Sequence, residues 1–381
     1  MPDDRTLRDP LQKVRNNFRV EWYRCPIDHS KLRQLMQPSD LQGWFQAGGH
    51  LLIAIVTGGG ALFFFEKEMW VPFFLALFLH GTVTTFFKGI AAHELGHGTV
   101  FRTKWLNKIF LRIYSIVSWH NFHEYAMSHT YHHRYTLHPK GDREVVLPQY
   151  ARSDLFYFLQ LFSINIFGGL YTSGCLPIVK GTIKTALGKF GTSVLNQEWS
   201  EALYTAHPTE RKYAVNWARS ILLFHFIVIT VTIYTQLWAL PLVLTFQQFT
   251  ANWLKHFVGF PMHCGLRSNV SDFRKSVRSM TLDPISEFLY WRMNWHLEHH
   301  MYAGIPCYNL KKLHQLVAHD MPKVRTLRGA WQEMRETWEK QRVDSGYEFD
   351  TPVPGPANCE DEAPDPLATS IGDLAPKALL K

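Results

Sequence analysis

The sequence predicts an all-α integral membrane protein with four transmembrane helices in two hairpins, interfacial helices and a cytosolic histidine-rich cap. Three observations support this prediction. Long apolar runs occur in two close pairs, almost every Lys and Arg lies outside these runs, and histidines gather where the runs end. The mean hydropathy of the whole chain is slightly negative because long polar segments dilute the apolar ones.

The first hairpin is expected over residues 44–65 and 69–87, which are separated only by the polar break Glu66-Lys67-Glu68. Each run approaches the ~20 apolar residues that a membrane-spanning helix needs. The second helix is predicted to continue as one rod from Met69 to His97. Such a rod would be longer than the apolar layer, so its last turn would lie just outside the membrane.

The second hairpin is expected over residues 220–238 and 239–260, which follow each other almost directly. Two shorter apolar segments, 105–119 and 155–171, contain charges or are followed by Gly and Pro. Both are predicted to be interfacial or half-inserted helices. A fifth span is the alternative for 155–171.

The chain divides into three parts. Residues 1–43 are predicted to form a cytosolic N-terminal segment, and 44–345 a membrane domain with its cytosolic cap. The remainder, 346–381, is acidic and rich in Pro and Ala, which is typical of a disordered tail. Two hairpins place both termini on one side, and the distribution of Lys and Arg predicts that this side, with the functional site, is cytoplasmic.

Histidines form three clusters, each placed after a pair of apolar runs or between them. Spacings of three and four residues bring side chains onto one face of a helix, so each cluster can direct its imidazoles at one point. With 20 histidines in 381 residues, one HxxHH pattern is expected by chance only about 0.05 times. The clusters are His93-x-x-x-His97, His129-x-x-His132-His133 and His296-x-x-His299-His300.

Eight clustered histidines exceed the needs of one metal ion and fit two ions close together. Imidazole suits iron, copper, zinc and nickel, so ligand type alone does not identify the metal. The five cysteines are scattered without a CxxC pair, which argues against a thiolate zinc site.

Two other kinds of protein share single features with this sequence. His93-Glu94-x-x-His97 matches the signature of zinc proteases, but a single zinc would leave six clustered histidines unused, and the third and fourth predicted spans contain no Asp or Glu. A metal-handling membrane protein would need ionisable groups along its spans. The spans offer only scattered single histidines, such as His80 and His225.

The sequence resembles the membrane fatty acid desaturase and hydroxylase superfamily over about residues 44–320. The resemblance rests on HxxxH, HxxHH and HxxHH in that order, and on the segment 294–317, NWHLEHHMYAGIPCYNLKKLHQLV. It implies two non-haem irons held by histidines, O2 as co-substrate, and removal of hydrogen from an unactivated alkyl group.

The resemblance also implies a ligand set. Asn252-x-x-x-His256 matches the family motif that supplies a ninth ligand, with His263 as the less favoured rival. One iron would take His93, His97, His132 and His299, with Asn252 holding a bound water. The other would take His129, His133, His256, His296 and His300. Carboxylates that could orient these rings are Glu94, Glu124, Asp142, Asp283, Glu287 and Glu298.

The expected reaction is therefore introduction of a C=C bond into a fatty acyl or related alkyl chain, with hydroxylation as the nearest alternative. Where many acyl-lipid desaturases continue the third cluster with Leu-Phe-Pro, this chain has Met301-Tyr302-Ala303. That departure resembles a bacterial subgroup that includes a desaturase of rhizobitoxine biosynthesis. A small non-lipid substrate therefore remains an alternative.

The expected partners are the membrane, the alkyl substrate and a separate electron donor, either a ferredoxin or a cytochrome b5-like protein, because the sequence contains no fused donor. No nucleic-acid partner is expected. Basic residues around the third cluster could attract an acidic donor or anionic lipid. They are Arg267, Arg274, Lys275, Arg278, Lys311 and Lys312.

Overall fold

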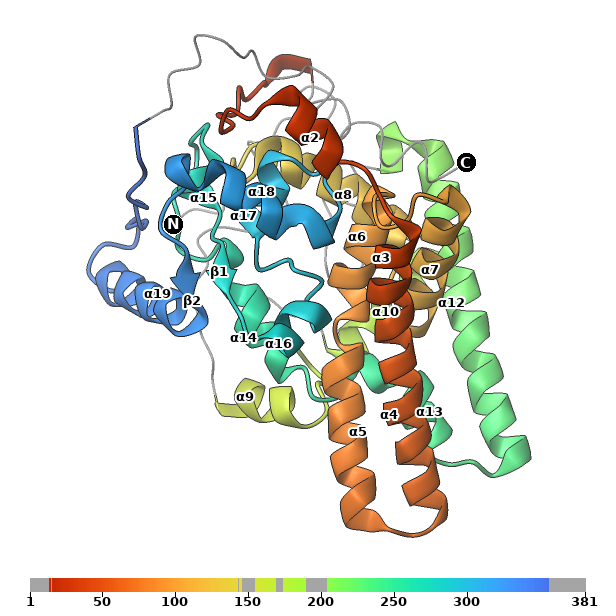
Figure 1. Ribbon diagram of the computed structural model, residues 1–381. Coiled ribbons are helices and arrows are strands. Elements are labelled where there is room, and N and C mark those ends of the chain that lie inside the picture. Colours follow the sequence, from red (N-terminus) through yellow and green to blue (C-terminus); the bar gives the residue numbers. More distant parts are fainter. Residues whose placement is uncertain are drawn as a thin grey trace.

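The computed structural model describes Val14 and residues 16–142, 144–145, 155–168, 174–189 and 204–355. Within these residues the protein is mostly helical, with two strands of two residues each (Figure 1). The α4–α5 hairpin and the lower part of α12 project from one side, and the short helices of the C-terminal half gather on the other (Figure 1).

The first hairpin forms as predicted. A continuous helix over Asp40–Glu66 consists of α3 (Asp40–Gly43), a π-helical segment (Trp44–Gly48) and α4 (Gly49–Glu66). After a tight turn, α5 (Trp70–Thr84) returns alongside α4. Gly58 permits close packing here, because a Cβ atom at this position would lie 2.7 Å from Val243 Cγ1 and 2.9 Å from His80 Cε1.

The helix after the first turn is not one rod, which corrects the expectation for Met69 to His97. It breaks after α5 and resumes as α6 (Ala92–His97). At the break Lys88 has extended backbone angles (φ −81°, ψ 127°), and Gly89 adopts a left-handed conformation with φ of 73°. Glycine adopts positive φ without a Cβ clash, so the sequence allows this turn at Gly89.

Three helical stretches in the described part of the chain are long and apolar enough to cross a membrane: Asp40–Glu66, Trp70–His97 with the break at Lys88 and Gly89 included, and Pro208–Thr235. The last of these is α12. The fourth predicted span, 239–260, is not a continuous helix. It consists of α13 (Leu240–Leu244), a 3-10 turn (Gln247–Phe249) and α14 (Trp253–Gly259), followed by a 3-10 turn (Phe260–Met262).

The interruption of this fourth segment has a specific cause. Residues 249–251 leave the helical path and pair with residues 163–165, where the backbone N–H of Ala251 donates to Ser163 O at 2.9 Å. Asn165 N donates to Phe249 O at 2.7 Å in the same pairing. Contacts between segments about eighty residues apart therefore override the local apolar pattern.

Single histidines within the spans link helices to one another. His50 Nδ1 accepts a hydrogen bond from Trp291 Nε1 at 2.8 Å. His80 lies 3.0 Å from both Thr57 Oγ1 and Val243 O. His225 lies 3.2 Å from Thr245 Oγ1 and stacks on Trp119. These contacts give the span histidines structural partners. The histidines therefore do not indicate a path for metal transport.

Shorter helices surround the hairpin. They are α2 (His29–Leu35), α7 (Lys104–Val117), α8 (Phe122–Tyr135), α9 (Leu155–Phe162) and α10 (Cys175–Ala186). The predicted segments 105–119 and 155–171 correspond to α7 and α9, and α9 ends well before the predicted limit. On α7, Phe110 and Tyr114 are buried while Trp105 and Ile109 are exposed, as expected for an amphipathic helix.

The C-terminal half forms a cap of short elements around β1 (Met280–Thr281), which pairs in parallel with β2 (Arg325–Thr326). Its helices are α15 (Phe273–Ser276), α16 (Pro284–Leu289), α17 (His296–Met301), α18 (Leu310–Val317) and α19 (Leu327–Gln341), with 3-10 turns at Cys307–Asn309 and Ala318–Asp320.

The cap uses two of the basic residues internally. Arg274 is buried between Asp272 and Asp320, and Arg278 is buried against Glu333. Neither guanidinium is therefore available to attract an acidic partner, whereas Lys311 and Lys312 remain exposed.

Ordered contacts extend past residue 345, into the segment predicted as a tail. Phe349 N donates to Gly265 O at 2.7 Å, and Arg325 donates to Thr351 Oγ1 at 3.0 Å. Residues 356–381, the rest of that predicted tail, lie outside the described residues.

Candidate metal centre

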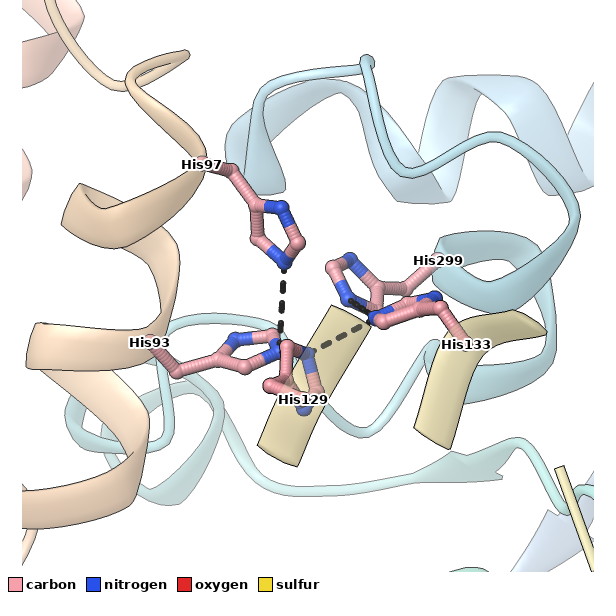
Figure 2. Close-up of side chains that lie close together, drawn as sticks. All are labelled: His93, His97, His129, His133 and His299. Carbon is pink, nitrogen blue, oxygen red and sulfur yellow. Dashed lines mark hydrogen bonds between the residues drawn. The ribbon is translucent and has the colours of Figure 1, made fainter. Parts of the chain in front are cut away.

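The three histidine clusters converge, and their imidazoles form two groups. In the first group the potential ligand atoms of His93, His97, His129, His133 and His299 all lie within 4.8 Å of one another. Figure 2 shows these rings pointing toward a common centre from α6, α8 and α17. In the second group, with the same limit, the ligand atoms belong to His132, His263, His296 and His300.

The geometry of the helix explains how each HxxHH cluster serves both groups. At about 100° per residue, the first and last histidines of the pattern lie only ~40° apart on the helix, and the middle one lies on the other side of the first. The outer pair His129 and His133 enters the first group, and the middle His132 enters the second. Conversely, His296 and His300 enter the second group, and His299 enters the first.

The ring nitrogens within each group are very close. Nε2 of His129 lies 2.6 Å from Nε2 of His93 and 2.8 Å from Nε2 of His133. Nε2 of His296 lies 3.0 Å from Nε2 of His263 and 3.1 Å from Nε2 of His300. Each group therefore concentrates several Nε2 atoms around one point.

The opposite nitrogens of four rings face acceptors. Nδ1 of His132 lies 2.9 Å from Asp142, and Nδ1 of His129 lies 3.1 Å from Glu144. Nδ1 of His263 lies 3.0 Å from the carbonyl oxygen of Ser276. Nδ1 of His300 lies 3.1 Å from Thr136 Oγ1, whose own proton goes to the carbonyl oxygen of His132.

These acceptors decide whether the site fits metal ions. An acceptor at Nδ1 places the ring proton there and leaves Nε2 with a bare lone pair. Several such lone pairs facing one another at about hydrogen-bond distance repel unless a cation lies between them. The arrangement therefore fits two metal ions, one for each group, and matches the way protein partners orient metal-binding histidines.

Electrostatics keep most of these rings neutral. Burial, followed by the charges of neighbouring histidines, holds the pKa of His129, His133, His296, His299 and His300 well below its usual range. Burial also lowers the pKa of His263 to about 3. Neutral imidazoles are the metal-binding form.

Asp142 and Glu144 add negative charge around the centre. Burial lowers the pKa of His132, but the carboxylate of Asp142 outweighs this effect and the net shift is upward. Burial raises the pKa of Glu144 to about 7. Bound cations next to these side chains would favour their charged forms.

Glu94, from the protease-like motif, is buried beside the ring nitrogens that face away from the centre. Its carboxylate lies 3.0 Å from Nδ1 of His93 and 3.6 Å from Nδ1 of His299. A zinc protease needs its Glu beside the metal-bound water. In this position Glu94 lies on the side of the rings away from the centre, which argues against the protease alternative.

The observed grouping differs from the predicted ligand set in two respects. His129 and His133 lie with His93, His97 and His299, whereas His132 lies with His296 and His300, so each HxxHH pattern is divided between the groups. His263, the less favoured rival of His256, lies in the second group. His256 is outside both groups: its Nδ1 lies 3.3 Å from the Tyr157 hydroxyl, and its ring stacks on Phe260.

Asn252 forms its hydrogen bonds with residues outside the two histidine groups. Its Nδ2 donates to Thr85 Oγ1 at 2.9 Å and to Gln248 O at 2.7 Å, and its Oδ1 accepts from Asn165 Nδ2 at 3.2 Å. This amide therefore joins α5, the broken fourth segment and the residues after α9. Its contacts give no support to the predicted role of holding a metal-bound water.

Of the six carboxylates predicted to orient metal-binding histidines, two lie beside the histidine groups and four have other partners. Asp142 and Glu94 lie beside histidines of the two groups. Glu298 accepts from His314 Nδ1 at 2.6 Å, and Thr185 donates to Glu124 at 3.1 Å. Glu287 accepts from Trp295, and Asp283 caps α16.

Glu144 was not predicted, although its position two residues after Asp142 could have indicated it. Thr136 and the carbonyl of Ser276 were also missed. A backbone carbonyl leaves no sequence signal.

Long apolar helices and two interlocking histidine groups together define a membrane-bound, histidine-rich metalloprotein. The chain belongs to the fatty acid desaturase family: the family model described as fatty acid desaturase matches residues 68–331, from the first turn to the beginning of α19. This range contains all three histidine clusters and His263. A comparison with curated proteins gave no match. Family membership and the apolar helices together indicate a membrane-associated oxidoreductase with a metal-binding histidine centre.

Proposed function

We propose that the protein is a membrane di-iron desaturase that uses O2 to introduce a C=C bond into a fatty acyl or related alkyl chain. The observation that carries this proposal is the pair of interlocking histidine groups inside the matched family range. One iron would be held by His93, His97, His129, His133 and His299. The other would be held by His132, His263, His296 and His300.

Two bound irons would supply the dioxygen chemistry that removes hydrogen from an unactivated carbon. The protein's own contribution is to position the rings. Asp142 and Glu144 orient His132 and His129 on α8, while Thr136 and the carbonyl of Ser276 orient His300 and His263. Fixing the proton on Nδ1 directs each Nε2 lone pair at the metal position.

A separate protein would supply the electrons, in this proposal a ferredoxin or a cytochrome b5-like protein, with the centre and both termini on the cytoplasmic side. Exposed Lys311 and Lys312 on α18 offer positive charge for an acidic donor. The same helix carries His314, whose ring is hydrogen bonded to Glu298, the neighbour of His299. This contact connects the surface of the cap with the metal centre.

Hydroxylation is the nearest alternative reaction, since it begins with the same removal of hydrogen. The histidine geometry serves both reactions equally. A small non-lipid substrate is a further alternative.

The test begins with metal analysis of purified, detergent-solubilised protein. The reduced protein is then exposed to O2 with a donor protein, and host lipids and polar metabolites are profiled by mass spectrometry. We expect two irons per chain and a product that lacks one H2 relative to its precursor. A His133→Ala variant that remains folded should lose both the metal of the first group and the product.

Other results would be equally clear. A product heavier by one oxygen atom would identify a hydroxylase. One zinc per chain without an oxidised product would contradict the proposal and return the protease alternative.

A further inference from the structure

A buried arginine binds the loop that carries His263. Arg278 has no exposed surface, and its Nη1 donates to the carbonyl oxygens of Pro261 and Cys264 at 2.8 and 2.5 Å. The backbone N–H of Arg278 donates to the carbonyl oxygen of Met262 at 2.8 Å. This one residue therefore binds the backbone on both sides of His263.

The loop depends on such bonds because it has little regular structure of its own. His263 directly follows the 3-10 turn Phe260–Met262, and Gly265 adopts a left-handed conformation with φ of 72°. Carbonyl groups at the end of a helical turn lack donors within the turn, and a buried carbonyl without a donor is unfavourable. Arg278 supplies donors to this stretch and so fixes the path of the backbone at His263.

The arginine is held in turn by α19. Its Nε donates to Oε1 of Glu333 at 2.6 Å, and Nε of Arg325 donates to Oε2 of the same carboxylate at 3.1 Å. A buried guanidinium is unfavourable without a negative partner, so Glu333 both neutralises Arg278 and fixes its direction. One turn later α19 also packs on the loop, since a Cβ atom on Gly265 would lie 2.9 Å from Thr337 Cγ2.

The chain after α19 returns to the same loop. Phe349 pairs in parallel with Leu266, and its N–H donates to the carbonyl oxygen of Gly265 at 2.7 Å. The backbone N–H of Ser268 donates to Oε2 of Glu348 at 3.0 Å. The matched family range ends at residue 331. The contacts from residue 333 onward are therefore made by a part of the chain that follows this range.

We propose that Arg278 and Glu333 are positioning residues for the second metal, and that they hold His263 in the second histidine group. Nε2 of His263 lies 3.0 Å from Nε2 of His296, while its Nδ1 faces the carbonyl oxygen of Ser276 at 3.0 Å. Residues 276–278 thus direct both the ring and the backbone of His263. Arg278 and Glu333 would act on the metal only through this histidine, since the two groups consist of histidines alone.

This inference rests on the proposed function insofar as the second group binds a metal. The test titrates metal-free, detergent-solubilised full-length protein with Co²⁺ against a competing chelator. Co²⁺ takes nitrogen ligands, and its visible absorption depends on them. We expect two bound ions in the wild-type protein, and the ion that is lost in His263→Ala identifies the second site.

The decisive variant is Glu333→Ala. It should weaken binding of the second ion about tenfold and leave the first within about twofold, because only His263 loses its support. Arg278→Met should weaken the second ion at least as much. Glu333→Gln should retain most of the affinity, since its amide oxygen can still accept from Arg278. It also keeps the test open if Arg278→Met does not fold.

A matched control lies on the same helix. Glu339 forms an exposed ion pair with Arg335 on α19, so Glu339→Ala should leave both affinities unchanged. A positioning role also predicts a spectroscopic change. At saturating Co²⁺, the absorption of the second ion in Glu333→Ala should shift toward that of His263→Ala, because His263 no longer reaches the metal. A purely structural role would weaken both ions alike and leave the spectrum of the bound ions unchanged.

The outcomes separate the inference from the proposed function. An unchanged second affinity in folded Glu333→Ala, or equal weakening of both ions, would overturn the inference even if the wild-type protein proves to be an iron desaturase. Wild-type protein that shows the selective Co²⁺ effect but holds no iron and yields no oxidised product would contradict only the proposed function.

Discussion

Nδ1 of His132 lies 2.9 Å from a carboxylate oxygen of Asp142, and both side chains are buried. The carboxylate is itself fixed, because it accepts from the backbone N–H groups of Leu137 at 2.9 Å and Glu144 at 3.0 Å. A loop held by its own backbone thus orients the one histidine of α8 that crosses to the second group. The metal affinity of that group should depend on this contact.

The variant Asp142→Asn tests this dependence. An amide can present an oxygen to the ring but carries no charge, so we expect the second metal to bind about 10- to 100-fold more weakly, with the first much less affected. Metal titration against a competing chelator measures both affinities. Asp283→Asn is the control, since Asp283 only caps the exposed start of α16 and Asn is an equally good cap. Equal losses in both variants would refute a specific role for Asp142.

His263 and His256 provide a direct comparison between structure and sequence pattern. We expect His263→Ala to lose the second metal, because it removes one of the four imidazoles of that group. His256→Ala should retain both metals, because its ring contacts Tyr157 and Phe260 outside the centre. Iron content per chain after purification decides between them. Loss of metal from His256→Ala alone would support His256, and not His263, as the metal ligand.

The sequence could predict what depends on local periodicity. The first hairpin, α12 and the three histidine clusters follow from apolar runs and from spacings of three and four residues. The division of the histidines between two groups could not be predicted from one cluster alone. It requires knowing how α8 and α17 face each other, which is a property of the packed structure.

The other differences arise from backbone breaks with non-local causes. The fourth segment is apolar enough for a span, yet Ala251 pairs with Ser163 and interrupts it. That break, together with the turn at Phe260–Met262, brings His263 to the centre and leaves His256 outside. The break at Lys88 and Gly89 comes directly after the apolar run 69–87, within the stretch predicted to be one rod.

The break in the second helix depends on Gly89, and this can be tested by comparing two glycines. Gly89→Ala places a Cβ atom on a residue with φ of 73°, which should destabilise the protein by roughly 1–2 kcal/mol and weaken metal binding at His93 and His97. Gly59→Ala is the control, since a Cβ atom there meets nothing within 4 Å and the residue is helical. Its expected effect is neutral or stabilising, because Ala favours helix.

Melting temperature in detergent and metal content report the two effects of these glycine substitutions. If Gly89→Ala were as stable as Gly59→Ala and bound both metals, the left-handed turn would not be required for the site.

The buried histidines predict how stability changes with pH in metal-free protein. Among the histidines of the two metal groups, six that lie outside the long apolar helices have a pKa held below the value of about 6.5 expected when unfolded. They are His129, His133, His263, His296, His299 and His300. Below that pH the unfolded chain takes up protons that the folded chain does not, so stability falls as the pH drops.

Two neighbouring groups act in the opposite direction. Asp142 raises the pKa of His132, and burial raises the pKa of Glu144 to about 7, so both favour the folded state at lower pH. Because the histidines with a lowered pKa outnumber these two groups, we expect the melting temperature of stripped protein to be lower at about pH 5 than at about pH 7.5. Replacing His133 and His300 together by Asn should reduce this difference, since it removes two of the buried bases. A melting temperature that rises on acidification would show that the histidines are not held neutral in the folded protein.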